Sequence, residues 1–311
     1  MFNLNLRKKF MLLFLLVGIV PLLIVSILLY NNANNEIEDK IYNSMKMYGS
    51  ITDNELEKYF SKKEGDIRVF ARTSKVYQSL NILKEIDKSI ESSRWQERID
   101  SLDKLVPHFV KEYGFACGYI TDTEGKVVYS TTDNIPLGTD IASRDYIKES
   151  LKGDLNWSEL FYSDVINKNA LVVSIPVKSK GNKGEITGTA NLLLDQSGID
   201  HIVHDGLDKL GKSADAYLIN SEGLLLTNTL LGKYQENAAL EKKINTKAVK
   251  LLSAPINNKD YSFNVTDQYP EYRDVPVLGE LSVTKIGNTP VGLIIEIDQE
   301  EVFSGTTKLR N

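Results

Sequence analysis

The sequence predicts an α+β protein, in which a long N-terminal helix precedes two tandem modules that are each built on an antiparallel sheet. Three observations lead to this prediction. An uncharged apolar run extends from Phe10 to Tyr30, apolar residues then recur at helical spacing to about Arg72, and a strand-rich pattern occurs twice after residue 114. With 311 residues, the chain is long enough to bury a core in each module.

The overall charge argues against a nucleic-acid partner. The formal net charge is −5, and lysines and arginines do not cluster among aromatic residues. The single cysteine, Cys117, lies in an apolar, strand-like run, so we expect a buried thiol and no intramolecular disulfide. The modules must therefore be held together by their apolar cores.

The apolar run is long enough to cross a membrane, because a helix rises about 1.5 Å per residue and the hydrocarbon core is roughly 30 Å thick. Basic residues from Arg7 to Lys9 precede it, and such flanks stay in the cytoplasm. A cleaved signal peptide is the alternative, but no small-x-small cleavage site follows Tyr30. We predict a single-pass protein of the cell membrane, with residues 1–9 cytoplasmic, a transmembrane helix at 10–30 and residues 31 onward extracellular.

Residues 31–113 are predicted to form a long stalk helix and a second helix. Between Asn35 and about Arg72 no proline interrupts a helical apolar stripe. Its members are Ile37, Ile41, Met45, Tyr48, Ile51, Leu56, Tyr59, Phe60, Ile67 and Phe70. Stalks of this length are often dimer interfaces, so we expect a homodimer through the stalk helix. The second helical region covers about Val76 to Tyr113, and Gly114 ends it.

The first module is assigned to residues 114–200 and begins with two strands joined by the tight-turn sequence at 122–125. After a segment with turn residues and a short helical patch, three further strands are expected. They are Trp157–Tyr162, Ala170–Val177 and Glu185–Leu194.

The pattern then repeats. The sequence from Tyr119 to Gly125 is echoed from Tyr217 to Gly223, and Leu194-Asp195-Gln196 is echoed by Ile297-Asp298-Gln299. We therefore assign a second, related module to residues 201–303 and the start of a C-terminal connector to 304–311. Its expected strands are Ala214–Ile219, Leu224–Asn228, Tyr261–Thr266, Val275–Ile286 and Val291–Ile297.

These features together resemble the double Cache (dCache) sensor of bacterial methyl-accepting chemotaxis receptors. Arg144-Asp145-Tyr146 followed by Ser150-Leu151-Lys152-Gly153 is similar to the family's pocket connector, and residues 172–177 to the strand behind it. Residues 206–223 and 272–279 resemble the start and end of the membrane-proximal module. The resemblance implies two PAS-like modules, of which the membrane-distal one binds the ligand and the proximal one relays.

The resemblance also implies a set of ligand-binding residues. The amino-acid-binding subgroup of the family uses the pattern Y-x4-R-x-W-Y, followed later by a Tyr and an Asp. In this chain Arg144 matches the Arg of the pattern, Tyr146 stands where the Trp is expected, and Tyr162 matches the later Tyr. Thr139 and Ile147 depart from the pattern, and Asn191 or Leu193 occupies the Asp position. A free amino acid would therefore lack a partner for its ammonium group, unless Asp164 supplies one.

The chemistry of these residues supports the same ligand-binding candidates, but several of them also have an alternative structural or surface role. Arg144 can clamp a carboxylate with paired hydrogen bonds, or it can be a surface residue that pairs with Asp140 or Asp145. Tyr129 and Tyr162 can line a pocket or fill the core, and Asp164 can be a solvated loop carboxylate. The predicted ligand-binding set is Tyr129, Arg144, Tyr146, Tyr162, Asp164 and Asn191.

The predicted function is a non-enzymatic extracellular sensor of a small polar or carboxylate ligand in a transmembrane chemoreceptor, relaying through the stalk to a cytoplasmic signalling module outside this chain. Alternatives are the sensor of a histidine kinase or diguanylate cyclase, or a surface-anchored adhesin or hydrolase. No catalytic or phosphate-binding motif is found. His201 and His204 share a helix face without further ligands, so neither metal nor cofactor is predicted.

Overall fold

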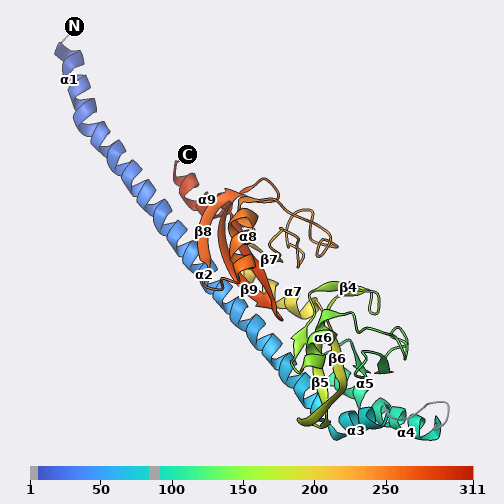
Figure 1. Ribbon diagram of the computed structural model, residues 1–311. Helices are drawn as coiled ribbons and strands as arrows, with labels where there is room; N and C mark the ends of the chain where they lie inside the picture. Colours follow the sequence, from blue (N-terminus) through green and yellow to red (C-terminus); the bar gives the residue numbers. More distant parts are fainter. Residues whose placement is uncertain (1–5, 84–91, 311) are drawn as a thin grey trace.

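One helix runs along almost the whole molecule in the computed structural model, which describes residues 6–83 and 92–310 (Figure 1). Helix α1 (Leu6–Phe14) continues through a π-helical turn, η1 (Leu15–Ile19), into α2 (Val20–Arg72). The widened turn directly precedes Pro21, whose ring crowds the carbonyl of the preceding turn. This N-terminal part is long and apolar enough to cross a membrane, and its described side chains are almost all exposed.

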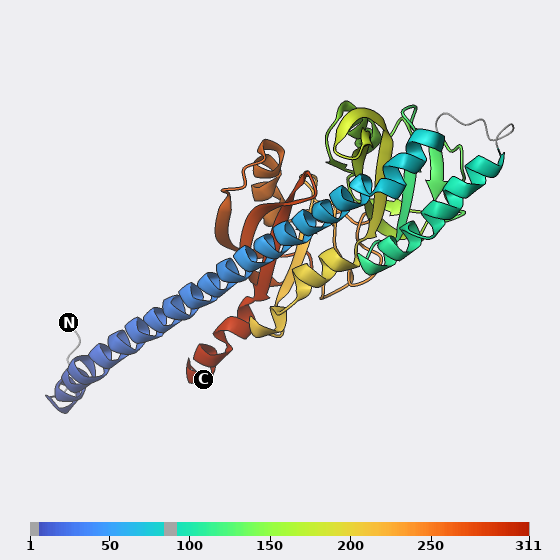
Figure 2. The ribbon, with the colours of Figure 1, turned by 90° about the horizontal axis from the view of Figure 1, so that it is seen from below.

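Beyond the apolar part, α2 buries one stripe against both sheets (Figure 2). The predicted stalk helix is confirmed as one continuous helix, although Ile51 is 53% exposed because Thr52, one residue on, takes the inward position. The inward residues recur every three or four positions, as a helix face requires. They are Met45, Tyr48, Thr52, Leu56, Phe60, Lys63, Ile67 and Phe70.

The first sheet lies against the C-terminal half of α2 (Figure 1). Its strand order is β2-β1-β6-β5-β3, with β4 also paired to β5, and every pairing is antiparallel. One face packs on α2 and neighbouring helices, whereas α6 (Asp145–Lys152) covers the other. The strands are β1 (Cys117–Thr121), β2 (Val127–Ser130), β3 (Asn156–Trp157), β4 (Phe161–Ser163), β5 (Lys168–Lys180) and β6 (Lys183–Asp195).

The second sheet lies nearer the apolar end of α2 and has the corresponding order β7-β10-β9-β8 (Figure 1). Helix α8 (Lys247–Asn258) covers the face turned away from α2, and α9 (Gln299–Arg310) follows the last strand. In both sheets the last strand of the long hairpin pairs with the first strand of its module, so the sequence repeat is also a repeat of topology. The strands are β7 (Asp215–Ile219), β8 (Asn264–Pro270), β9 (Pro276–Ile286) and β10 (Thr289–Asp298). The predicted α+β class is thus confirmed.

The second helical region differs from its prediction. Within the described residues it is broken into α3 (Ser74–Leu83), α4 (Ser92–Asp103) and α5 (Val106–Glu112). A break is expected before α5 because Pro107, at its start, lacks the N–H that a continuing helix needs. Residues 84–91, which include the predicted apolar position Ile90, lie outside the described residues.

Two predicted strands also differ. The segment predicted as Trp157–Tyr162 is divided between β3 and β4, because the Ser158 hydroxyl accepts the Val172 N–H and interrupts the ladder. The segment predicted as Leu224–Asn228 makes only isolated bridges. There the side-chain oxygen of Asn228 accepts the N–H groups of Ala238 and Ala239.

The two sheets touch through a turn and a tryptophan. Gly287, in the turn between β9 and β10, has a φ of 58°, and a Cβ added there would lie 2.7 Å from the Trp157 ring. Trp157 is 4% exposed and meets Phe60 of α2 edge-on, with ring centroids 5.0 Å apart. A connection through α7 (Ser197–His204) and η2 (Leu207–Lys209) joins the sheets along the chain.

A buried carboxyl group lies where α2 crosses the second sheet. Glu280 of β9 is fully buried, and its Oε2 lies 3.1 Å from the position of an ideal Cβ at Gly49. The absence of a side chain at Gly49 therefore lets the helix approach. Burial raises the pKa of Glu280 from 4.5 to about 8, although the Asn264 amide donates to its other oxygen.

This burial predicts a pH dependence of stability. A carboxyl whose pKa is raised by folding favours the folded state fully below about pH 4.5, and this contribution is lost as the pH rises toward 8. The variant Glu280→Gln should therefore have a flatter profile and be more stable than the wild type at pH 8, by roughly 2 to 4 kcal/mol. Urea unfolding at several pH values measures the pH profile of each protein and their difference in stability at pH 8. If the free energy of unfolding changed with pH equally in the wild type and in Glu280→Gln, Glu280 would be ionised in the folded protein.

Candidate functional site

Polar side chains line the space between α6 and the face of the first sheet that it covers, which we call the α6 layer. Register places Tyr119 of β1 opposite Asn191 of β6, and Asn191 opposite Ser174 of β5, so all three side chains share one face. From the helix, Tyr146 and Ser150 are buried toward the sheet. The surrounding residues are apolar, including Val127, Ile147, Val172 and Leu193.

Two tyrosines meet across this layer. The hydroxyls of Tyr119 and Tyr146 are 3.1 Å apart and either can donate. Burial raises the pKa of both hydroxyls, while the positive charge of Arg144 acts in the opposite direction on each. Arg144 directly precedes α6 and its side chain is exposed, so its guanidinium lies at the solvent side of the tyrosine pair.

Asn191 forms the floor of the layer. It is fully buried, and its amide nitrogen donates to the Thr189 hydroxyl at 2.9 Å and to the Tyr119 carbonyl at 3.3 Å. Its side-chain oxygen, however, accepts no hydrogen bond from the described residues. Since a buried polar atom without a partner costs free energy, this oxygen is poised to accept from another group.

The same is true of three serine hydroxyls. Ser150 of α6, Ser163 of β4 and Ser174 of β5 are all at most 2% exposed, and none has a hydrogen-bond partner among the described residues. Side-chain alternation puts Ser163 on the same side as Phe161, which packs in the cluster under α6. The layer thus combines an arginine, two tyrosines and several unpaired polar atoms, which suits a small polar ligand.

The structure brings three predicted residues together, namely Arg144, Tyr146 and Asn191, and places Tyr129 elsewhere. Tyr129 of β2 pairs in register with Ile120, so its side chain lies on the opposite face, among the helices. Its hydroxyl donates to Asp103 of α4 at 2.9 Å. Burial and this contact raise its pKa, as for a tyrosine whose hydroxyl is satisfied within the core.

Tyr162 and Asp164 lie outside the α6 layer, close to its edge. Phe161 points into the α6 layer, so Tyr162 points away from it; it is 56% exposed and lines a separate cavity of about 340 Å³ with Gln196 and Asn228. Asp164 is exposed in the loop after β4. Neither side chain reaches the tyrosine pair in this arrangement.

Sequence reasoning missed Tyr119, Ser150 and Ser174. Ser174 is the one polar residue in an apolar strand, Leu171 to Val177, and Tyr119 opens the repeated sequence. Both signals were present, but the pairing of Tyr119 with Tyr146 depends on how α6 lies over the sheet. Cys117, on the same face, is a buried free thiol as expected, and burial raises its pKa to about 12.

The second sheet has a different polar cluster at the corresponding place. Tyr217, the repeat of Tyr119, donates to Glu296 at 2.9 Å, and Tyr272 donates to Asp215 at 2.8 Å. Burial raises the pKa of Glu296 to about 8 and also raises that of Asp215. This cluster is acidic, whereas the named residues of the α6 layer carry no carboxylate.

Comparison with known proteins agrees with this architecture. The family model described as Cache domain matches residues 30–306. No curated protein matches the chain. The sensor domain of the V. cholerae histidine kinase DctB is 11% identical, with a TM-score of 0.59, over 84% of this chain and 98% of that one.

Chemoreceptor domains are similar to the same degree. The ligand-binding domain of Campylobacter jejuni Tlp3, in complex with 4-methylisoleucine, is 13% identical over 86% of this chain and 94% of its own, with a TM-score of 0.58. That of the Pseudomonas aeruginosa PAO1 amino-acid chemoreceptor PctC, in complex with GABA, is 15% identical over 82% and 99%, with a TM-score of 0.54. At sequence identities this low, the similarity shows a shared fold.

Two like sheets on one long helix, with a polar layer inside the first, define a sensor domain of the ligand-binding class. Within that class the chain belongs to the Cache domain family, because the family model covers most of its length. The expected resemblance is thereby confirmed, together with the fold class that it implied.

The tyrosine pair provides a test of the α6 layer. Either Tyr119→Phe or Tyr146→Phe leaves the other hydroxyl unpaired and should lower the free energy of unfolding by about 1 kcal/mol. The double variant should lose less than the sum, because it removes both partners. Urea unfolding measures the coupling, with the 49%-exposed Tyr261→Phe as a control; additive losses would mean that the hydroxyls do not interact.

Proposed function

We propose that this chain is the extracellular sensor region of a transmembrane chemoreceptor, and that it binds a small polar ligand with a carboxylate in the α6 layer. The observation that carries the proposal is the set of buried oxygens without partners on Asn191, Ser150 and Ser174. A bound ligand would satisfy them and stabilise the packing of α6 on the sheet.

The positive charge of Arg144 is the reason to expect a negatively charged ligand. The guanidinium is exposed, and its positive charge acts on the two tyrosine hydroxyls, which can donate hydrogen bonds. A carboxylate bound there would gain charge-assisted hydrogen bonds without displacing an ion pair, since no acidic partner of Arg144 is found among the described residues. The absence of a carboxylate among the layer's named residues favours a ligand without an ammonium group, although an amino acid could still reach Asp164.

Signal transfer would use α2. We propose residues 10–30 as the membrane helix, residues 31 onward as extracellular, and homodimerisation through the stalk. The module at 114–200 would be membrane-distal and bind the ligand; that at 201–303 would be proximal and relay. A ligand with different affinities for two arrangements of α2 would bias a signalling module beyond this chain.

The sensor of a membrane histidine kinase is the second candidate, favoured by the likeness to the DctB sensor domain. It shares the proposed ligand site and differs in the output domain, as would a diguanylate cyclase. A surface adhesin or hydrolase has no specific observation in its favour.

Ligand binding can be tested by thermal shift of the full chain in detergent. Small carboxylates and amino acids are screened, and a true ligand at 100 times its Kd should stabilise the fold by about 2.7 kcal/mol and raise Tm by several degrees. Arg144→Ala should abolish the shift. Lys148→Ala is the matched control, because it removes another exposed cation of α6 that pairs only with Asp145.

The outcome separates the alternatives. A shift lost in Arg144→Ala and kept in Lys148→Ala supports the α6 layer. A ligand that stabilises both variants as well as the wild type binds elsewhere, and the proposed site is then wrong.

A further inference from the structure

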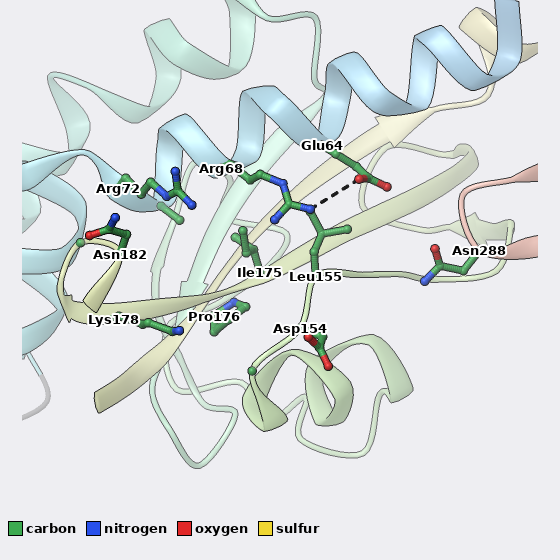
Figure 3. A pocket seen from close by; sticks show the side chains of 13 residues that line it. Glu64, Arg68, Arg72, Asp154, Leu155, Ile175, Pro176, Lys178, Asn182 and Asn288 are labelled. Carbon is green, nitrogen blue, oxygen red and sulfur yellow. Dashed lines mark ion pairs between the residues drawn. The ribbon is translucent and has the colours of Figure 1, made fainter. Parts of the chain in front are cut away.

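A cavity lies apart from the α6 layer, where the C-terminal end of α2 meets the β5–β6 hairpin (Figure 3). Its volume is about 480 Å³, within the usual range of small-molecule sites. The lining comes from α2, from β5 and its turn, from residues 153–155 after α6, and from Asn288 in the β9–β10 turn. The cavity therefore joins the stalk helix to both sheets.

Three cationic side chains surround this cavity: Arg68 and Arg72 of α2, and Lys178 of β5 (Figure 3). Glu64 holds Arg68, with 3.6 Å between the guanidinium and the carboxylate, and its other oxygen accepts the Trp157 indole N–H at 3.1 Å. Within residues 6–83 and 92–310, Arg72 and Lys178 have no acidic partner within ion-pair distance. Arg72 and Lys178 thus carry positive charges outside any ion pair, and the lining as a whole, which includes the carboxylates of Glu64 and Asp154, has a net charge of +1.

The other lining groups are compatible with an anion. Asn182 and Asn288 bring side-chain amides that can donate hydrogen bonds. Pro176, which also lines the cavity, has no N–H and so offers no backbone donor. One further carboxylate, Asp154, lines the cavity, but it lies on the side away from the two arginines (Figure 3).

We propose that this cavity is a binding site for a small polyanion, a metabolite that carries at least two negative charges on carboxylate or phosphate groups. Guanidinium groups bind both kinds of anion through paired hydrogen bonds, and a lysine adds a point charge. Arg72 and Lys178 lie on different elements, α2 and β5, and neither has an ion-pair partner among the described residues, so a ligand with two anionic groups can contact both. Metabolite size follows from the volume of the cavity, which a macromolecular segment would exceed.

The position of the site gives binding a structural consequence. Arg72 is the last residue of α2, and Lys178 and Asn182 flank the turn of the long hairpin of the first sheet. Asn288 lies in the β9–β10 turn of the other sheet. A polyanion held by these groups would bridge the stalk helix and both sheets, independently of the ligand in the α6 layer.

The proposal is tested by isothermal titration calorimetry on the full chain in nanodiscs of zwitterionic lipid, with citrate and inorganic phosphate as separate probes. At least one probe should bind the wild type, and the double variant Arg72→Gln with Lys178→Gln should raise its Kd at least about tenfold. Binding should weaken with added salt. Citrate alone would identify a polycarboxylate site, whereas phosphate binding would identify a phosphate site.

Two controls make the result decisive. Lys62→Gln with Lys180→Gln removes the same charge from exposed positions of the same two elements outside the cavity, and should keep Kd within about twofold. Arg144→Ala should bind the probe like the wild type, so this test is separate from that of the α6 layer. The proposal is overturned if neither probe binds the wild type, if both double variants lose binding equally, or if Arg144→Ala alone abolishes it.

Discussion

Both sheets rest on the same surface, the inward stripe of α2 from Met45 to Phe70. Neither sheet has another element of comparable length to cover that face, so the two cores are continuous through one helix. Polar contacts fix the register along it. Tyr48 donates to the Val203 carbonyl, Asp53 accepts from Thr284, and the ammonium group of Lys63 donates to the carbonyls of Tyr113 and Gly114. A displacement of α2 along its axis would break contacts in both modules together.

Much of this arrangement could be predicted from the sequence, because periodicity determines which residues face a core. The helix to Arg72, the strand pairs and the repeat follow from local patterns. The errors in the strands occurred where side chains compete with the backbone ladder, as Ser158 and Asn228 do, and the second helical region is interrupted before Pro107. For the site, the resemblance indicated Arg144, Tyr146 and Asn191, whereas Tyr119 and Ser174 depend on packing across the sheet, which no local pattern encodes.

Repetition of the fold did not preserve the chemistry of its interior. Tyr119 and Tyr217 occupy the same place in their strands, but one meets another tyrosine and the other a carboxyl group. In the second sheet the Tyr217 hydroxyl donates to one oxygen of Glu296, and burial raises the pKa of that carboxyl to about 8. Buried oxygens without a partner among the described residues occur in both sheets: Asn191 and Ser174 in the first, and the other Glu296 oxygen and the Tyr269 hydroxyl in the second. The two interiors therefore differ in charge: the second sheet holds buried acids such as Glu296 and Asp215, whereas the named residues of the α6 layer carry no carboxylate.

The contact between Gly287 and the Trp157 ring has a geometric meaning for how the two modules move. Because no side chain separates them, the turn lies directly on the indole, which in turn is held by Phe60 and Glu64 of α2. The indole therefore fills the space between α2 and the β9–β10 turn, and the two modules cannot come closer at this point unless the ring is displaced. The spacing of the two modules thus depends on a glycine: any side chain at position 287 would have to push the indole, and with it the contact to Phe60, out of place.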